Sequence, residues 1–240
     1  MEKTENLEET IYKKLEKLSE PEKKVKLPQF FQAFPEGYGE GDKFIGVRVP
    51  NVRKIAKQYQ NIELNDLIPL ITNEFHEIRQ CAFMILVNKM QKAKKETQQE
   101  EIVQFYQKYI EYCNNWDLVD GTAPNILGVY LINKNKDILY KYACSGDLWL
   151  QRIAVLSTYY FIKERKFDDT LQLAEILLDN PHDLIHKAVG WMLREIGNRH
   201  RPTEEAFLLQ NYKKMPRTML RYSIEKFPQE LRQRYLKGLI

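Results

Sequence analysis

Four short segments of this chain resemble one another and recur at intervals of 32 to 40 residues. They are Ile78–Ala82, Leu118–Thr122, Leu150–Ala154 and Ile185–Val189, and each opens the second helix of a predicted helix pair. An interval of this size is typical of HEAT-like repeats, which stack into a superhelix with the second helices on its concave side. The sequence therefore predicts an all-α fold, an α-α superhelix (solenoid) of HEAT-like helical-pair repeats that spans residues 1–240 as a single domain.

Apolar residues recur at helical spacing along most of the chain, and the period-two alternation of a half-buried strand is absent. Predicted helices cover residues 4–18, a segment from Pro21 that Pro28 interrupts, a segment that begins near Pro50, and then 63–72, 74–93, 97–112, 115–132, 135–144, 147–164, 168–178, 182–198, 203–212, 216–226 and 228–238. The glycine-rich segment 35–42 lacks the Lys-Ser/Thr pair of a phosphate-binding loop. We therefore expect a connecting loop there, and the role of Gly37–Gly41 stays open.

The composition is that of an ordinary globular protein with a sizeable core, because 43% of the residues are hydrophobic and 29% are charged. No apolar run reaches the roughly 18 residues that a membrane helix needs. The first 20 residues are charged and lack a signal-peptide core, which favours a cytoplasmic protein. Cys81, Cys113 and Cys144 are far apart and form no zinc pattern, so we expect buried thiols in a reducing compartment.

The charge is distributed unevenly along the chain. The formal net charge is only +4, but residues 185–240 carry +7 and the remaining residues sum to −3. A basic C-terminal quarter is typical of proteins that bind a polyanion. The charge alone fits a solvated helix surface equally well, and both interpretations stay open at this point.

The stretch around Trp116 is the strongest candidate for chemistry. Asn114 or Asn115 can cap a helix start, and Asp117 then falls in the first turn, where a carboxylate suits the helix dipole. Trp116 and Asp120 are four residues apart and therefore share one face of that helix. A carboxylate in this otherwise apolar segment needs a partner. An aromatic face beside a carboxylate is also what a site for a positively charged group requires.

The repeat register places further polar residues beside this pair. Asp120, Arg152 and Lys187 fall at equivalent positions of three successive repeats, and we expect them to lie side by side on the concave surface. Trp191 is four residues after Lys187, and Gly190 next to it leaves room for a ligand to approach. Each feature also has a structural explanation: a tryptophan of a helical array can belong to the core, and Asp120 with Arg152 can form a salt bridge between repeats.

Other catalytic arrangements find no support in the sequence. Neither a Ser-His-Asp nor a Cys-His arrangement can be argued. The histidines show no nucleophile partner and no metal-ligand spacing, and we expect structural or surface roles for all of them: His76, His182, His186 and His200. The sequence therefore predicts a site without a metal.

Four segments of the chain resemble segments of a known family. Asn115–Asp120, Asp147–Arg152 and Lys187–Glu195 are similar to the three signature segments of the AlkD-like DNA alkylation repair family, and Phe44–Arg53 resembles its entry segment. The resemblance covers roughly residues 20–230. Four ordered motifs at compatible spacing form a fairly specific signal, whereas one of them alone would be weak.

The resemblance implies a monofunctional DNA glycosylase of base excision repair. Such an enzyme removes positively charged N-alkylated purines, 3-methyladenine and 7-methylguanine among them, from duplex DNA. The implied enzyme needs no cofactor and no metal, does not bind a membrane, acts as a monomer, and works on the nucleoid of a bacterial cytoplasm. Two alternatives stay open: a non-catalytic HEAT-like DNA-binding protein of the same superfamily, and a scaffold for protein–protein interaction.

Four residues match the active-site positions of the family: Trp116, Asp120, Arg152 and Trp191. The resemblance gives Asp120 the task of stabilising a cationic sugar and orienting water, and Arg152 that of holding a phosphate and keeping Asp120 ionised. The two indoles would contact the cationic nucleoside, at roughly 0.5–2 kcal/mol each. Expected DNA contacts are Arg48, Arg53, Lys54, Lys187, Arg194 and Arg221, and candidates for an N-terminal aromatic contact are Phe31, Phe34 and Tyr38.

Overall fold

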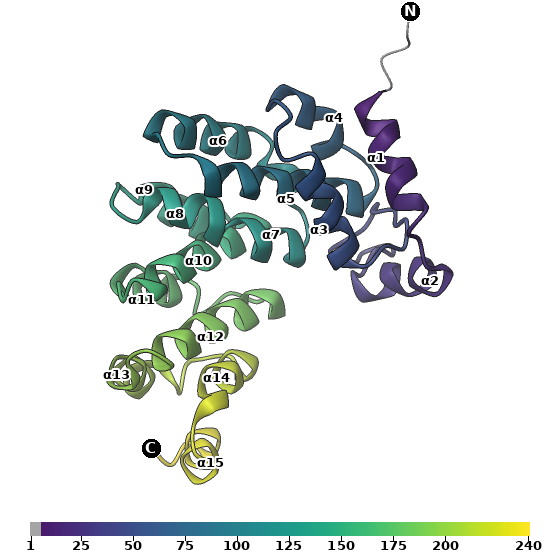
Figure 1. Ribbon diagram of the computed structural model, residues 1–240. Helices are drawn as coiled ribbons and strands as arrows, with labels where there is room; N and C mark the ends of the chain where they lie inside the picture. The colour runs from purple at the N-terminus through teal and green to yellow at the C-terminus, as the bar shows by residue number, and fades with distance from the viewer. Residues whose placement is uncertain (1–5) are drawn as a thin grey trace, which may run out of the picture. The chain divides into compact units, whose positions relative to one another are not determined.

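The computed structural model describes residues 6–240 and confirms the predicted fold class. In this part of the chain the regular elements are helical, and one isolated β-bridge joins Lys43 to Phe75. The chain forms two compact units, the first ending at Thr122 and the second beginning at Ala123. Each unit is built from packed helices (Figure 1), and each is described in turn.

Helix α5 is the centre of the first unit. It packs against α3, α4, α6 and α7, and side chains on nearly all of its faces are buried. The elements of this unit are α1 (Leu7–Glu16), α2 (Pro21–Phe30), α3 (Val49–Gln58), the 3₁₀ turn η1 (Asn65–Leu67), α4 (Ile68–Ile71), α5 (His76–Lys92), α6 (Glu96–Lys108), the 3₁₀ turn η2 (Ile110–Tyr112) and α7 (Trp116–Thr122).

The second unit has two rows of helices. Figure 1 shows α9, α11 and α13 in one row and α10, α12 and α14 in the other, and α12 packs against α10, α13 and α14. This arrangement of helix pairs is the one that the repeat predicted. The elements are η3 (Pro124–Gly128), α8 (Val129–Leu131), α9 (Asp137–Ala143), α10 (Leu148–Lys163), α11 (Asp168–Ile176), α12 (Asp183–Gly197), α13 (Arg201–Asn211), α14 (Arg217–Ser223), η4 (Ile224–Lys226) and α15 (Gln229–Lys237).

The structure confirms the register of the repeat. Each of the four similar segments begins at the third residue of a helix: Ile78 in α5, Leu118 in α7, Leu150 in α10 and Ile185 in α12. Met219, at the third position of α14, continues the series 34 residues after Ile185. The predicted site residues at the fifth helical position are therefore equivalent in the repeat, and in chain order they are Asp120, Arg152 and Lys187.

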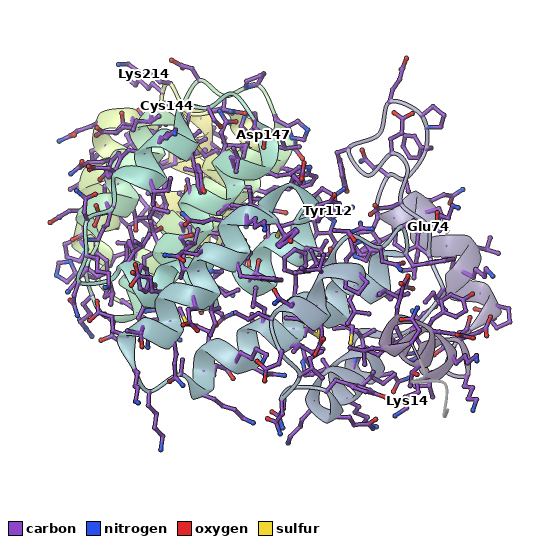
Figure 2. The ribbon with its side chains drawn as sticks, turned by 90° about the horizontal axis from the view of Figure 1, so that it is seen from above. Lys14, Glu74, Tyr112, Cys144, Asp147 and Lys214 are labelled. Carbon is purple, nitrogen blue, oxygen red and sulfur yellow. The ribbon has the colours of Figure 1, made fainter. Side chains whose placement is uncertain are left out.

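A recurring turn explains where these helices begin. Asn73, Ser145 and Asn180 each stand three residues before a helix and accept the backbone N–H two residues later, at 2.9, 3.2 and 2.9 Å. Asp147, labelled in Figure 2, then caps α10 by accepting two N–H groups of its first turn. Short polar side chains before a helix satisfy N–H groups that lack an intrahelical partner, so the sequence sets these boundaries locally.

Two details of the predicted helices are wrong. Helix α2 runs through Pro28, because the missing proline N–H removes only one hydrogen bond from a helix that buries none of its side chains. The predicted helix 115–132 is divided into α7, a π-helical turn and α8, and the N–H of Gly128 donates to the carbonyl of Ala123 five residues earlier, at 2.9 Å. Pro124, which has no N–H for the α-helical ladder, opens this wider turn.

The cysteines are buried at two of the three positions. Cys81 and Cys113 are buried, and burial raises the pKa of both thiols to about 12. Cys144 is exposed, so the prediction of a buried thiol is wrong there. It caps the C-terminus of α9 and leads into a turn, which lifts its side chain away from the helix packing.

The space beside Gly190 belongs to another helix. A Cβ at this position would lie 2.5 Å from the backbone oxygen of Met219 and 2.6 Å from the Cβ of Tyr222. Both atoms belong to α14, so the glycine allows α12 and α14 to approach closely. The expected opening for a ligand is therefore wrong, and Gly190 is a packing residue.

Gly190→Ala is expected to lower the free energy of unfolding by about 1–3 kcal/mol, because the added methyl group forces α12 and α14 apart. Gly121→Ala is the matched control. A Cβ at Gly121 meets no atom within 4 Å, so this substitution is expected to raise stability by up to about 1 kcal/mol through helix propensity. Urea denaturation measures both, and similar effects of the two substitutions would show that the close approach is unimportant.

Candidate functional site

Helix α7 carries two of the predicted site residues. Trp116 is its first residue and Asp120 its fifth, so the two side chains share one face of the helix as predicted, and both are partly exposed. Asn115 is fully buried immediately before the helix, and its Oδ1 accepts the N–H of Trp116 at 2.9 Å. The start of α7 is therefore fixed by a buried amide.

Aromatic rings hold the indole of Trp116. Phe31 stacks on it with ring centroids 5.3 Å apart, and the edge of Phe30 meets it at 5.6 Å. Phe31 in turn stacks on Phe44 at 5.4 Å and on the imidazole of His76 at 4.7 Å. Because Phe31 is only 6% exposed, its ring serves as a support for Trp116, whereas Phe34 is exposed and Tyr38 is partly exposed.

A buried network of charges lies behind these rings. His76 is 1% exposed, and its Nδ1 and Nε2 lie 3.0 Å from Oδ2 of Asp42 and 2.9 Å from Oδ2 of Asp117. Arg79 donates to Oδ1 of Asp42 at 2.6 Å, and Gln80 donates to Oδ2 of Asp117 at 2.7 Å. Two carboxylates from distant segments are thus bound by side chains from the first turns of α5.

The protonation of His76 follows from these partners. Burial by itself would lower the pKa of the imidazole, but Asp117 and Asp42 outweigh it and raise the pKa of His76 to about 9. For Asp42, burial would raise the pKa of the carboxyl, and His76 and Arg79 overcome this effect and lower it. Near neutral pH the cluster therefore holds an imidazolium and a guanidinium beside the two carboxylates.

The glycine-rich segment 35–42 forms the loop that the sequence predicted and delivers Asp42 to this network. A Cβ at Gly39 would lie 2.3 Å from the backbone oxygen of Phe31 and 3.0 Å from the side-chain nitrogen of Asn115. A Cβ at Gly37 would lie 2.1 Å from the backbone oxygen of Gln32. The glycines are needed because the loop passes directly against the backbone that follows α2.

The sequence predicted a structural or surface role for His76, which is buried, but did not predict its partners. Asp117 was expected only to suit the helix dipole, and Asp42 was not singled out. The partners of His76 are 34 and 41 residues away and follow no periodic spacing. The available signal was the trio His76, Arg79 and Gln80, whose spacing places polar groups on one face at the start of a buried helix.

Arg152 lies in α10 of the second unit. Its side chain is almost fully enclosed, at 4% exposure, and Nη1 donates to the backbone oxygen of Leu184 at 2.6 Å. Leu184 belongs to the first turn of α12. The guanidinium therefore links two consecutive repeats. This is a structural role, whereas the sequence predicted a contact with a phosphate.

Trp191 is partly exposed on α12. Its indole N–H donates to Oε1 of Glu195 at 3.2 Å, and its ring lies 5.9 Å from that of Tyr159. Arg199 donates to the other carboxylate oxygen of Glu195 at 2.7 Å and lies over the ring of Tyr159 at 5.8 Å. The bond from the indole N–H to Glu195 orients the ring of Trp191, and the guanidinium of Arg199 lies next to the neighbouring ring of Tyr159.

The six predicted DNA-contacting cations fall into two groups of three. The first group forms ion pairs, namely Arg48 with Glu20, Lys187 with Asp183 and Arg194 with Glu225. The second group has exposed side chains: Arg53, Lys54 and Arg221. Ion pairs at the surface contribute little stability, so a phosphate can compete for the paired cations as well. Within residues 6–240, His, Cys, Asp and Glu side chains form no cluster able to hold a metal ion.

The fold and the site define a class of protein: a helical-repeat protein with an indole and a carboxylate on one helix face and cations on several repeats. The sequence matches the family model of the DNA alkylation repair enzyme over residues 11–227, and the chain belongs to this family. It therefore has a role in DNA alkylation repair as an enzyme that acts on DNA. The resemblance noted in the sequence is confirmed.

A solved structure shares the fold. The predicted DNA alkylation repair enzyme from Enterococcus faecalis superimposes with a TM-score of 0.71 over 88% of this chain and 97% of that one, at 16% sequence identity. No curated protein matches the sequence. Each helix in residues 6–240 is too short or too polar to cross a membrane.

Proposed function

We propose that this protein is a monofunctional DNA glycosylase that releases cationic N-alkylated purines, such as 3-methyladenine and 7-methylguanine, from duplex DNA. The observation that carries the proposal is the placement of Trp116 and Asp120 on one face of α7, both reachable from solvent. The rings of Phe30 and Phe31 pack against the indole and support it. Membership of the alkylation repair family supports the same substrate class.

The chemistry explains why these residue types suffice. A purine alkylated at N3 or N7 carries a positive charge and leaves as a neutral base without a general acid. The sugar then develops oxocarbenium-like charge, which the carboxylate of Asp120 can stabilise while it orients the attacking water. The indole of Trp116 offers its face to the cationic nucleoside. The proposed reaction needs no covalent enzyme intermediate.

Residues of the second unit have DNA contacts of their own in this proposal. Trp191 would offer a second indole, and the cations of α12 and α14 would contact phosphates. Arg152 is almost fully buried and donates to the backbone oxygen of Leu184, so in this proposal it holds α10 against α12 and does not contact a phosphate. Duplex binding should accordingly weaken steeply with salt.

The test is release of free base by the wild-type protein. Duplex DNA treated with a methylating agent is incubated with excess protein, and the liberated purines are separated and identified. We expect 3-methyladenine and 7-methylguanine in the soluble fraction and no normal bases. Salt-sensitive binding of this DNA without any released base would instead identify a non-catalytic DNA-binding member of the family.

A further inference from the structure

The buried cluster around His76 has no part in the proposed chemistry, yet it lies directly against the helix that carries it. His76 begins α5, Asp42 ends the glycine-rich loop, and Asp117 is the second residue of α7. One imidazole therefore joins three segments that the chain brings together from a distance.

We propose that His76 is a positioning residue for base release, and that its bond to Asp117 sets the placement of α7 and hence of Trp116 and Asp120. This inference rests on the proposed glycosylase function. It assigns to His76 no contact with DNA. Its effect passes through Asp117, which follows Trp116 in the chain and precedes Asp120 by three residues.

The carboxylate of Asp117 is held from two sides. Oδ2 lies 2.9 Å from Nε2 of His76 and accepts from Gln80 at 2.7 Å. Oδ1 accepts the backbone N–H of Leu118 at 2.9 Å. Since α7 is only seven residues long, a fixed point in its first turn leaves little freedom for the residues that follow. Placing a reacting group wrongly by about 1 Å can reduce a rate a hundredfold.

A second route leads from His76 to the indole. The imidazole stacks on Phe31 at 4.7 Å, and Phe31 stacks on Trp116 at 5.3 Å. A displaced imidazole would therefore disturb the ring that supports Trp116. Both sets of contacts act on α7. The bond to Asp117 holds its backbone, and the stacked ring of Phe31 holds the side chain of Trp116.

The cationic form of His76 suits this task better than the neutral one. Two carboxylates face the imidazole, Asp42 on the loop and Asp117 on α7, and Arg79 of the same helix binds the other oxygen of Asp42. An imidazolium donates from both nitrogens and satisfies both carboxylates. A neutral ring has a single N–H, so its second nitrogen would face a carboxylate oxygen lone pair to lone pair.

Two variants of His76 separate positioning from general stability. The amide nitrogen of His76→Gln reaches the place of Nε2, next to Asp117, whereas that of His76→Asn reaches only the place of Nδ1, next to Asp42. We expect His76→Asn to lower the single-turnover rate of base release about tenfold or more, and His76→Gln to stay within about threefold of the wild type. Affinity for undamaged duplex should be unchanged, and His200→Gln, at an exposed histidine, is the matched control.

Asp117→Asn provides an independent variant in case His76→Asn does not fold. It keeps the size of the side chain but removes the charge that binds the imidazolium, and its rate should fall as in His76→Asn. Wild-type rates in folded His76→Asn or folded Asp117→Asn would overturn the proposal. Equal losses in His76→Gln and His76→Asn would also overturn it, because they would indicate a loss of packing and not of the bond to Asp117.

A spectroscopic measurement makes the result independent of activity. The indole N–H resonance of Trp116, assigned with a Trp116→Phe variant, should shift in His76→Asn and stay in place in His200→Gln. A resonance that does not move in His76→Asn contradicts the positioning role. If the wild type releases no alkylated base, the proposed function fails, while this resonance still reports whether His76 places α7.

Discussion

Asp120→Asn is expected to lower the single-turnover rate of alkylpurine release by at least about 100-fold while duplex binding persists. The substitution keeps the shape of the side chain but removes the negative charge that would face the oxocarbenium-like sugar, and loss of one such electrostatic group typically costs two to three orders of magnitude. The measurement uses excess protein on a duplex with a single 7-methylguanine, so that binding and product release do not limit the rate.

The matched control for this prediction is Asp179→Asn. Asp179 is exposed in the turn before α12, and its substitution changes the net charge by the same amount. We expect its rate and its salt dependence to equal those of the wild type. An Asp120→Asn protein that releases base at the wild-type rate would remove Asp120 from the chemistry, whatever its effect on affinity.

Glu77→Ala is expected to have the largest effect on stability, a loss of about 3–5 kcal/mol. Glu77 is 2% exposed, and its carboxylate accepts the backbone N–H groups of Ile45, Gly46 and Val47 at 2.9, 2.8 and 3.1 Å. Gly46 has a φ of +95° and lies against α2, where an added Cβ would be 2.8 Å from the backbone nitrogen of Lys24. Removing the carboxylate leaves three buried donors without an acceptor.

Glu74→Ala is the comparison for that prediction. Glu74, labelled in Figure 2, has a side chain that is 57% exposed and pairs with Lys43. Because exposed ion pairs contribute little, we expect a change of less than about 1 kcal/mol. Urea denaturation of both variants gives the difference, and similar losses would mean that the carboxylate of Glu77 is not what anchors the segment.

Much of the fold was predictable because its signals are local. Helical periodicity marks each helix, and short polar residues such as Asn73 and Asn180 mark where the second helices begin. The recurrence of Ile78, Leu118 and Leu150 then gave the repeat register directly. The errors also have local causes, since Pro28 is tolerated in a helix without buried side chains and Pro124 produces a π-helical turn that periodicity does not reveal.

For the candidate site, the sequence predicted a shared position only where two residues are neighbours on one helix. Trp116 and Asp120 are four apart, so their shared face follows from helix geometry. No spacing rule predicts the contacts of His76 with Asp42 and Asp117, because the path of the loop that carries Asp42 depends on tertiary packing. Gly190 shows the same limit: a glycine next to a tryptophan indicates a close approach, but not that the approaching group is α14.

A stable mimic of the cationic sugar tests whether Asp120 faces the positive charge that develops during base release. Two duplexes are compared, one with a cationic pyrrolidine in place of the lesion sugar and one with a neutral tetrahydrofuran. We predict that wild-type protein binds the cationic duplex at least tenfold more tightly and that Asp120→Asn loses this preference. Equal affinity of the wild type for the two duplexes would show that Asp120 does not face a developing positive charge.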